Sequence, residues 1–100
     1  MIKVKVETKN SIYTKISILG HAMYDDYGKD IVCSAASSIA TTTINGILTL
    51  NEESLSYQVK EGSLIIEKIS NDETTQKLLE NMVNLLKELE RQYPTNIEVK

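Results

Sequence analysis

The sequence predicts an α+β domain in which two helices pack on one face of a largely antiparallel sheet. Several short segments alternate apolar and polar residues, which is the pattern of half-buried strands, and two longer segments repeat apolar residues at helical spacing. The strands come in consecutive pairs, which favours hairpins with the helices gathered on one side. The predicted order is β-β-α-β-β-α-β, within a single domain that spans residues 1–100.

The first two strands are predicted at residues 2–7 and 12–18, joined by a turn at residues 9–11. Apolar residues alternate with charged ones in the first strand. In the second strand, one face is predicted to hold Ile12, Thr14, Ile16 and Ile18. Gly20 then lets the backbone leave the sheet, and this places His21 at the exit.

A helix is predicted from Ile31 to Leu50, with Asp30 as its N-cap. Its apolar stripe is predicted to be Val32, Ala35, Ala36, Ile39, Ala40, Thr43, Ile44 and Ile47. The opposite side carries only small uncharged residues, which suits contact with another helix or subunit. The run lacks charge over the length of a membrane span, but eight of its residues are Ser, Thr or Asn, so we expect burial within protein and no membrane contact.

The second half repeats the outline of the first. Strands are predicted at residues 55–60 and 64–69, with Glu61-Gly62 as a two-residue turn. Residues 70–73 resemble a capping box that opens a second helix. Its apolar stripe is predicted to be Leu78, Leu79, Met82, Val83, Leu86, Leu89 and Tyr93, with Pro94 ending it and a short strand at 97–100.

Composition excludes several classes of function. A net charge of −3 argues against binding to nucleic acid, and a single cysteine cannot form an internal disulfide. The N-terminus lacks the apolar core of a signal peptide, so the cytosol is the expected location. One His and one Cys are too few for an ordinary metal site, even with Asp25 and Asp26, and Gly20 and Gly28 form no phosphate-binding fingerprint. We expect no metal and no cofactor.

The candidate site is the stretch from Gly20 to Cys33, which holds the only histidine and the only cysteine. The first turn of a helix favours a thiolate, and the strand exit can bring His21 close to it. A thiolate with a nearby imidazole can perform nucleophilic catalysis, and helix amides around Cys33 could contribute to an oxyanion hole. Cys33 as a packed apolar residue or as a redox sensor remains an alternative. Asp30 could orient the imidazole, although capping is its simpler role.

The loop between the two candidate catalytic residues contains Tyr24, Tyr27 and Gly28. Its length and its glycine boundaries fit a mobile lid, and they also fit an ordinary solvated loop tip.

These residues suggest a family. Gly20-His21-Ala22, five residues, Gly28, one residue and Asp30-Ile31-Val32-Cys33 closely resemble the signature of the ribosomal-processing cysteine proteases Prp, and the match continues through Ser37. The resemblance implies a bacterial, cytoplasmic endopeptidase that removes an N-terminal extension from the twenty-seventh protein of the large ribosomal subunit. It implies that Cys33 is the nucleophile and His21 the general base and acid, with supporting roles for Asp30, Ser37 and Gly20.

The resemblance also implies a homodimer and a substrate with a hydrophobic, aromatic-containing stretch before the cut, hence an apolar groove. Ser34 stands where the family commonly has Ala, which could change hydrogen bonding beside the nucleophile. The competing hypothesis is a non-enzymatic, ribosome-associated binding module in which Cys33 is structural.

Overall fold

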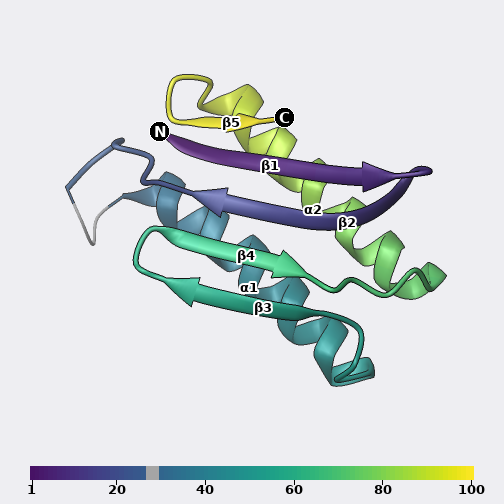
Figure 1. Ribbon diagram of the computed structural model, residues 1–100. Coiled ribbons are helices and arrows are strands. Elements are labelled where there is room, and N and C mark those ends of the chain that lie inside the picture. The colour runs from purple at the N-terminus through teal and green to yellow at the C-terminus, as the bar shows by residue number, and fades with distance from the viewer. Residues whose placement is uncertain (27–29) are drawn as a thin grey trace.

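The computed structural model describes residues 1–26 and 30–100, and its architecture is the predicted α+β arrangement (Figure 1). In chain order the elements are β1 (Ile2–Lys9), β2 (Ile12–Leu19), α1 (Ile31–Leu50), β3 (Ser56–Lys60), β4 (Ser63–Glu67), α2 (Glu73–Gln92) and β5 (Ile97–Val99). The strands form one five-stranded sheet, and both helices lie on the same face of it (Figure 1). The predicted order of elements is confirmed.

The strand order across the sheet is β3-β4-β2-β1-β5. Neighbours are antiparallel except for β1 and β5, which run parallel. As a result, the end of β2, the turn between β3 and β4, the start of α1 and the start of β5 all lie at one end of the molecule (Figure 1). Segments that are far apart in sequence are thereby brought together at this end.

The core lies between the sheet and the two helices. Each helix buries one face, as its apolar spacing predicts. The buried residues of α1 are Val32, Ala36, Ala40, Ile44 and Ile47, and those of α2 are Thr75, Leu79, Met82, Val83, Leu86 and Leu89. Fully buried Ile16 and Ile66 meet them from the central strands. Burying a side chain of this size stabilises the fold by about 1.5–3 kcal/mol.

The charge-free composition of α1 has a local explanation. Its length and its mean hydropathy of 1.4 would allow it to cross a membrane. However, its apolar residues join the strands and α2 in one core, and its exposed side carries hydroxyl and amide groups. The helix is therefore a core helix of this fold.

The predicted faces of β2 are wrong at its start, because the strand contains a bulge. Val6 pairs with Ile16 and Glu7 with Lys15, but Thr8 pairs with Tyr13, so Thr14 has no partner in β1. An extra residue reverses the alternation beyond it. Thr14 is consequently exposed, and Tyr13 packs against the core instead. The side-chain amide of Gln76 in α2 bonds both the N–H and the carbonyl of Tyr13, at 2.8 and 3.1 Å.

Two predicted boundaries are also corrected. The N-cap of α2 is Asp72, whose carboxylate accepts from the backbone N–H and the hydroxyl of Thr75, each at 2.9 Å, so the helix does not begin with a Ser70 capping box. Strand β4 ends at Glu67, two residues early, because Lys68 adopts a φ of 52°, which breaks the extended backbone.

Candidate active site

The end of β2 is tied to the turn between β3 and β4. The Gly20 N–H donates to the carbonyl of Gly62 at 2.8 Å, which continues the contact between the two strands. Gly20 has a φ of +91°, and a Cβ there would lie 2.5 Å from the carbonyl oxygen of Met1. Only glycine satisfies both conditions. The predicted supporting role of Gly20 is therefore geometric, since it directs the chain towards His21.

Cys33 occupies the third position of α1, as predicted, and it is partly buried. Its Sγ accepts a hydrogen bond from the backbone N–H of Ala22 at 3.2 Å. Ala22 follows His21 directly and is 1% exposed. The strand exit and the first turn of the helix thus meet, as the sequence indicated, and an amide points at the thiol.

Asp30 is the N-cap, but it does more than cap. One carboxylate oxygen accepts from the N–H groups of Val32 and Cys33 at 2.9 and 3.0 Å. The other accepts from Tyr24 and Asp25, at 2.9 and 3.3 Å, so the side chain joins the loop to the helix. Burial raises the pKa of Asp30, but the four backbone N–H donors outweigh it and hold this pKa below its ordinary value.

The same bonds correct one expectation. The amides of Val32 and Cys33, which the sequence offered for an oxyanion hole, donate to Asp30. The N–H of Ser34 donates to the carbonyl of Asp30 at 3.0 Å. The amide that donates to the thiol instead comes from the strand exit, at Ala22.

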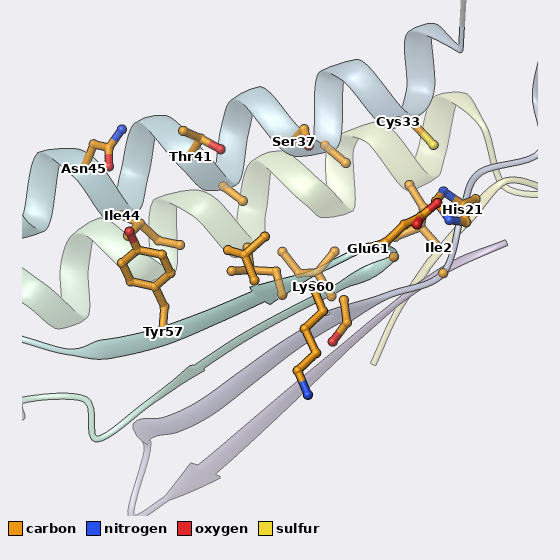
Figure 2. A pocket seen from close by; sticks show the side chains of 18 residues that line it. Ile2, His21, Cys33, Ser37, Thr41, Ile44, Asn45, Tyr57, Lys60 and Glu61 are labelled. Carbon is orange, nitrogen blue, oxygen red and sulfur yellow. The ribbon is translucent and has the colours of Figure 1, made fainter. Parts of the chain in front are cut away.

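His21 is exposed and stands over the turn between β3 and β4 (Figure 2). A Cβ at Gly62 would lie only 3.1 Å from its Nε2, and Gly62 has a φ of +69°. The turn must therefore present a bare backbone to the imidazole. Glu61, the other turn residue, lines the same cavity as His21.

An open groove begins at these residues and runs along α1. Its volume is about 570 Å³, and Cys33 and His21 lie at one end while Tyr57 and Ile44 lie towards the other (Figure 2). The helix contributes one wall, and β3 and β4 contribute most of the other. The lining is mostly apolar or uncharged, and Lys60 and Glu61 are the only Lys, Arg, Asp or Glu residues among the described lining.

The remaining predicted site residues lie in different parts of the structure. Ser37 lies on the groove wall, one turn beyond Cys33 (Figure 2). Tyr24 is half-exposed, and its ring meets Tyr93 edge to face at 5.3 Å, so this residue anchors the loop to the end of α2. Tyr27 and Gly28 lie outside the described residues. Within residues 1–26 and 30–100, no three His, Cys, Asp or Glu side chains are grouped as metal ligands would be.

The sequence placed Ala22 in the candidate stretch without a role, and it did not indicate Gly62 or Asn96 as parts of the site. The Asn96 side-chain N–H donates to the carbonyl of Ala22 at 3.0 Å, across 74 positions of sequence. Gly62 was recognised as a turn residue, but only the strand order places it beside His21. No local sequence signal predicts either contact.

A thiol in the first turn of a helix and an imidazole both line one end of an open groove with few charges, and such a groove can hold a peptide against a thiol. Comparison with known proteins agrees. The family model of cysteine protease Prp matches residues 1–98, and the chain belongs to this family of ribosomal-processing cysteine proteases.

A curated relative, the ribosomal processing cysteine protease Prp of Staphylococcus aureus, is 32% identical over 89 residues, which cover 86% of this chain and 84% of that protein. A crystal structure of Prp from S. aureus with a covalently linked product peptide superposes with a TM-score of 0.94 at 29% identity, covering 100% of this chain and 98% of that one. A second, with a substrate peptide, gives a TM-score of 0.87 at 28% identity and the same coverage.

Proposed function

We propose that this protein is the endopeptidase that removes the N-terminal extension from the twenty-seventh protein of the large ribosomal subunit, with Cys33 as nucleophile and His21 as general base and acid. The observation that carries the proposal is the position of Cys33. Its thiol stands in the first turn of α1, at the head of the groove, and receives an N–H from the residue that follows His21.

The proposed reaction has two steps. His21 takes the proton of the Cys33 thiol, and the thiolate attacks the scissile carbonyl carbon. The tetrahedral intermediate then collapses to a thioester as His21 donates that proton to the leaving amine. A water molecule then gives a proton to His21 and attacks the thioester. The second collapse releases the new carboxyl terminus and regenerates the thiol and imidazole pair. The attacking thiol and the imidazole that transfers the protons both lie at the same end of the groove.

The groove suits an apolar stretch of peptide. From Cys33 to Asn45 the helix wall is about 18 Å long, at about 1.5 Å per residue. An extended peptide advances about 3.4 Å per residue, so the wall accommodates about five residues. The exposed apolar side chains of the groove are Tyr57 and Val59 of β3, while Ala36, Ala40 and Ile44 line it with little exposed surface. These features support a substrate with a hydrophobic, aromatic-containing segment beside the cut.

The solved relatives support the same chemistry. The S. aureus structures are those of a ribosomal processing protease, one with a substrate peptide and one with a covalently linked product peptide. A covalent link is what a thiol nucleophile would leave on an acylated peptide. This agreement favours Cys33 as the attacking group, since it is the single cysteine of the chain.

The decisive experiment is cleavage of the purified ribosomal protein precursor, followed by mass spectrometry. The wild-type protein should release the extension, and Cys33→Ala should not. His21→Ala should retain alkylatable thiol but cleave at least about a hundredfold more slowly, because general acid and base catalysis contributes about 10²- to 10⁴-fold. Turnover by Cys33→Ala equal to that of the wild type would refute the catalytic assignment.

A non-enzymatic binding module remains the competing function, and thiol reactivity separates the two. A purely structural Cys33 should resist iodoacetamide at neutral pH, whereas a catalytic thiolate should alkylate quickly. Fast alkylation together with precursor cleavage excludes the binding module.

We further propose a cytoplasmic homodimer. The exposed side of α1 supports this in part, because Ser34, Ser38 and Thr42 are small, uncharged and exposed. Ser37, Thr41 and Asn45, on the neighbouring row, line the groove instead, so they have another role. Sedimentation equilibrium should give twice the chain mass, and a chain mass at all concentrations would contradict the dimer.

A further inference from the structure

The loop that follows β2 is held from the far end of the chain. Asn96 lies between α2 and β5, and its side-chain amide donates to the carbonyl of Ala22 at 3.0 Å. The backbone of Asn96 is fixed independently, because its N–H donates to Tyr93 and its carbonyl accepts from Ile2, each at 2.9 Å. The side chain is therefore presented to Ala22 by a rigid turn.

Ala22 passes this restraint to the thiol. Its carbonyl is held by Asn96, and its own N–H donates to Cys33 Sγ at 3.2 Å. Ala22 is 1% exposed, so these bonds are shielded from competing water. A thiolate accepts a hydrogen bond much better than a thiol does, and an N–H fixed in this position favours the reactive form.

The backbone beyond Ala22 shows that the arrangement is enforced. Met23 adopts a φ of 58°, a conformation that a residue with a side chain rarely takes, and it is 78% exposed. Bonds on both sides impose this conformation, namely Asn96 to Ala22 and the N–H of Tyr24 to Asp30. Backbone strain of this kind persists only where the surroundings over-determine it.

We propose that Asn96 is a positioning residue for the nucleophile: through the carbonyl of Ala22 it holds the Ala22 N–H on Cys33 Sγ. The proposal rests on the proposed function insofar as Cys33 is the nucleophile. It assigns no contact between Asn96 and the substrate. Without the Asn96 amide, the peptide unit between Ala22 and Met23 can rotate, the backbone at Ala22 is no longer fixed, and the thiolate loses its fixed donor.

The test uses the reactivity of the single cysteine, so each variant reports on Cys33 alone. Rates of alkylation by iodoacetamide are measured across the neutral pH range for the wild type, Asn96→Ala and Asn96→Asp. Asp has the shape of Asn but presents no donor when ionised, so it distinguishes the hydrogen bond from the volume of the side chain. The other titratable groups that line the groove, namely His21, Tyr57, Lys60 and Glu61, and Asp30 beneath the first turn, are the same in every variant.

Both Asn96 variants should slow alkylation at a fixed neutral pH by up to about tenfold, because the sulfur loses a fixed hydrogen-bond donor. Their kcat for the extension peptide should fall by a similar factor, with KM within about twofold of the wild type, because the interaction acts on the nucleophile and not on substrate binding.

Val99→Ala is the matched control. It removes packing from β5 and leaves the Asn96 side chain and its bond to Ala22 in place. Melting curves establish that the compared variants are folded at the assay temperature. Unchanged alkylation profiles in both Asn96 variants would overturn the proposal, and so would an equal slowing in Val99→Ala at equal stability. Because alkylation needs no ribosomal substrate, failure of the wild type to cleave the precursor would refute the proposed function without deciding the role of Asn96.

Discussion

An aspartate caps the N-terminus of each helix, and the two aspartates accept hydrogen bonds from different parts of the chain. Asp72 accepts only from near neighbours in sequence, namely the N–H and hydroxyl of Thr75 and the side chain of Ser70. Asp30 accepts from two amides of α1 and from two amides of the loop that precedes it. The first arrangement is what a helix needs at its start. The second also fixes the loop beside the nucleophile.

The surroundings of the two caps differ in the same sense. Around Asp72 the contacts are local, apart from the Gln76 amide that satisfies the bulged backbone at Tyr13. Around Asp30 the chain is irregular: residues 22–25 donate to Asp30 and to Cys33, and Asn96, distant in sequence, holds Ala22. The comparison teaches that the cap of α1 also fixes the loop around Cys33, the proposed nucleophile, whereas the cap of α2 only starts its helix.

The largest expected effect concerns these caps. Asp30→Ala should lower kcat/KM by about a hundredfold, because a displacement of about 1 Å at the nucleophile has that cost. Asp72→Ala should leave kcat/KM within about twofold, because it lies away from the groove and its effect on stability should not couple to the site. Steady-state kinetics on the extension peptide, with melting curves for each variant, measure both.

Asp30→Asn refines this comparison. The amide keeps one acceptor for Val32 and Cys33 but replaces the other with a donor, so the bonds to Tyr24 and Asp25 are lost while the cap remains. Its activity should lie between those of the wild type and Asp30→Ala. Equal losses for the Asp30 and Asp72 variants would show that both caps act only through stability.

A smaller effect is expected at Gly62, which faces His21 at the same end of the molecule. Gly62→Ala should lower kcat/KM about tenfold, since its Cβ would lie 3.1 Å from Nε2 and the imidazole must shift. Gly46→Ala is the matched control, because nothing lies within 4 Å of a Cβ there, and it should stabilise the helix by about 0.5–1 kcal/mol without changing activity.

The φ of +69° at Gly62 introduces a second cause of loss, backbone strain. Gly62→Asn separates the two, because Asn tolerates this conformation better than Ala but still carries a Cβ. Asn should lose as much activity as Ala. Wild-type activity in Gly62→Asn would mean that strain, and not contact with the imidazole, limits the alanine variant.

The smallest effect is the response of stability to acid. The pKa values of Asp30 and Asp72 are both lowered from the ordinary value of 3.8 in the folded protein. Both carboxylates therefore stabilise the fold above about pH 4, and this contribution is lost as the pH falls through the lowered pKa values. Urea unfolding should give a free energy that declines below about pH 4, with a shallower decline in Asp72→Asn. A stability that rises with acid would contradict both pKa directions.

Local rules sufficed for the parts of the site that are close in sequence. The position of Cys33 in the first turn followed from the cap at Asp30, and the approach of the strand exit to that turn followed from the short loop between them. The apolar stripe of α1 also followed from spacing, since every predicted residue except Thr43 belongs to the core or packs against it. These features depend on a few consecutive residues.

Other features depend on which strands become neighbours. Gly62 meets His21 because β4 pairs with β2, and Asn96 meets Ala22 because β5 lies beside β1. The free-energy differences that select a strand order are distributed over the whole core, so no single segment records them. The bulge at Thr14 has the same origin, because burying Tyr13 against the core and bonding it to Gln76 compensates for one unpaired residue.

Strand β5 comes last in the order of elements, and this has a consequence for the synthesis of the protein. Among the described strands, β5 forms the one parallel pair, with β1, and Asn96 directly precedes β5. A nascent chain that has emerged only as far as α2 can already form four strands and both helices. It still lacks the amide that fixes Ala22 on the thiol. Proteolytic competence should consequently arrive late in synthesis, after most of the domain has taken shape, so that a half-made protease beside the ribosome is a poorly reactive one.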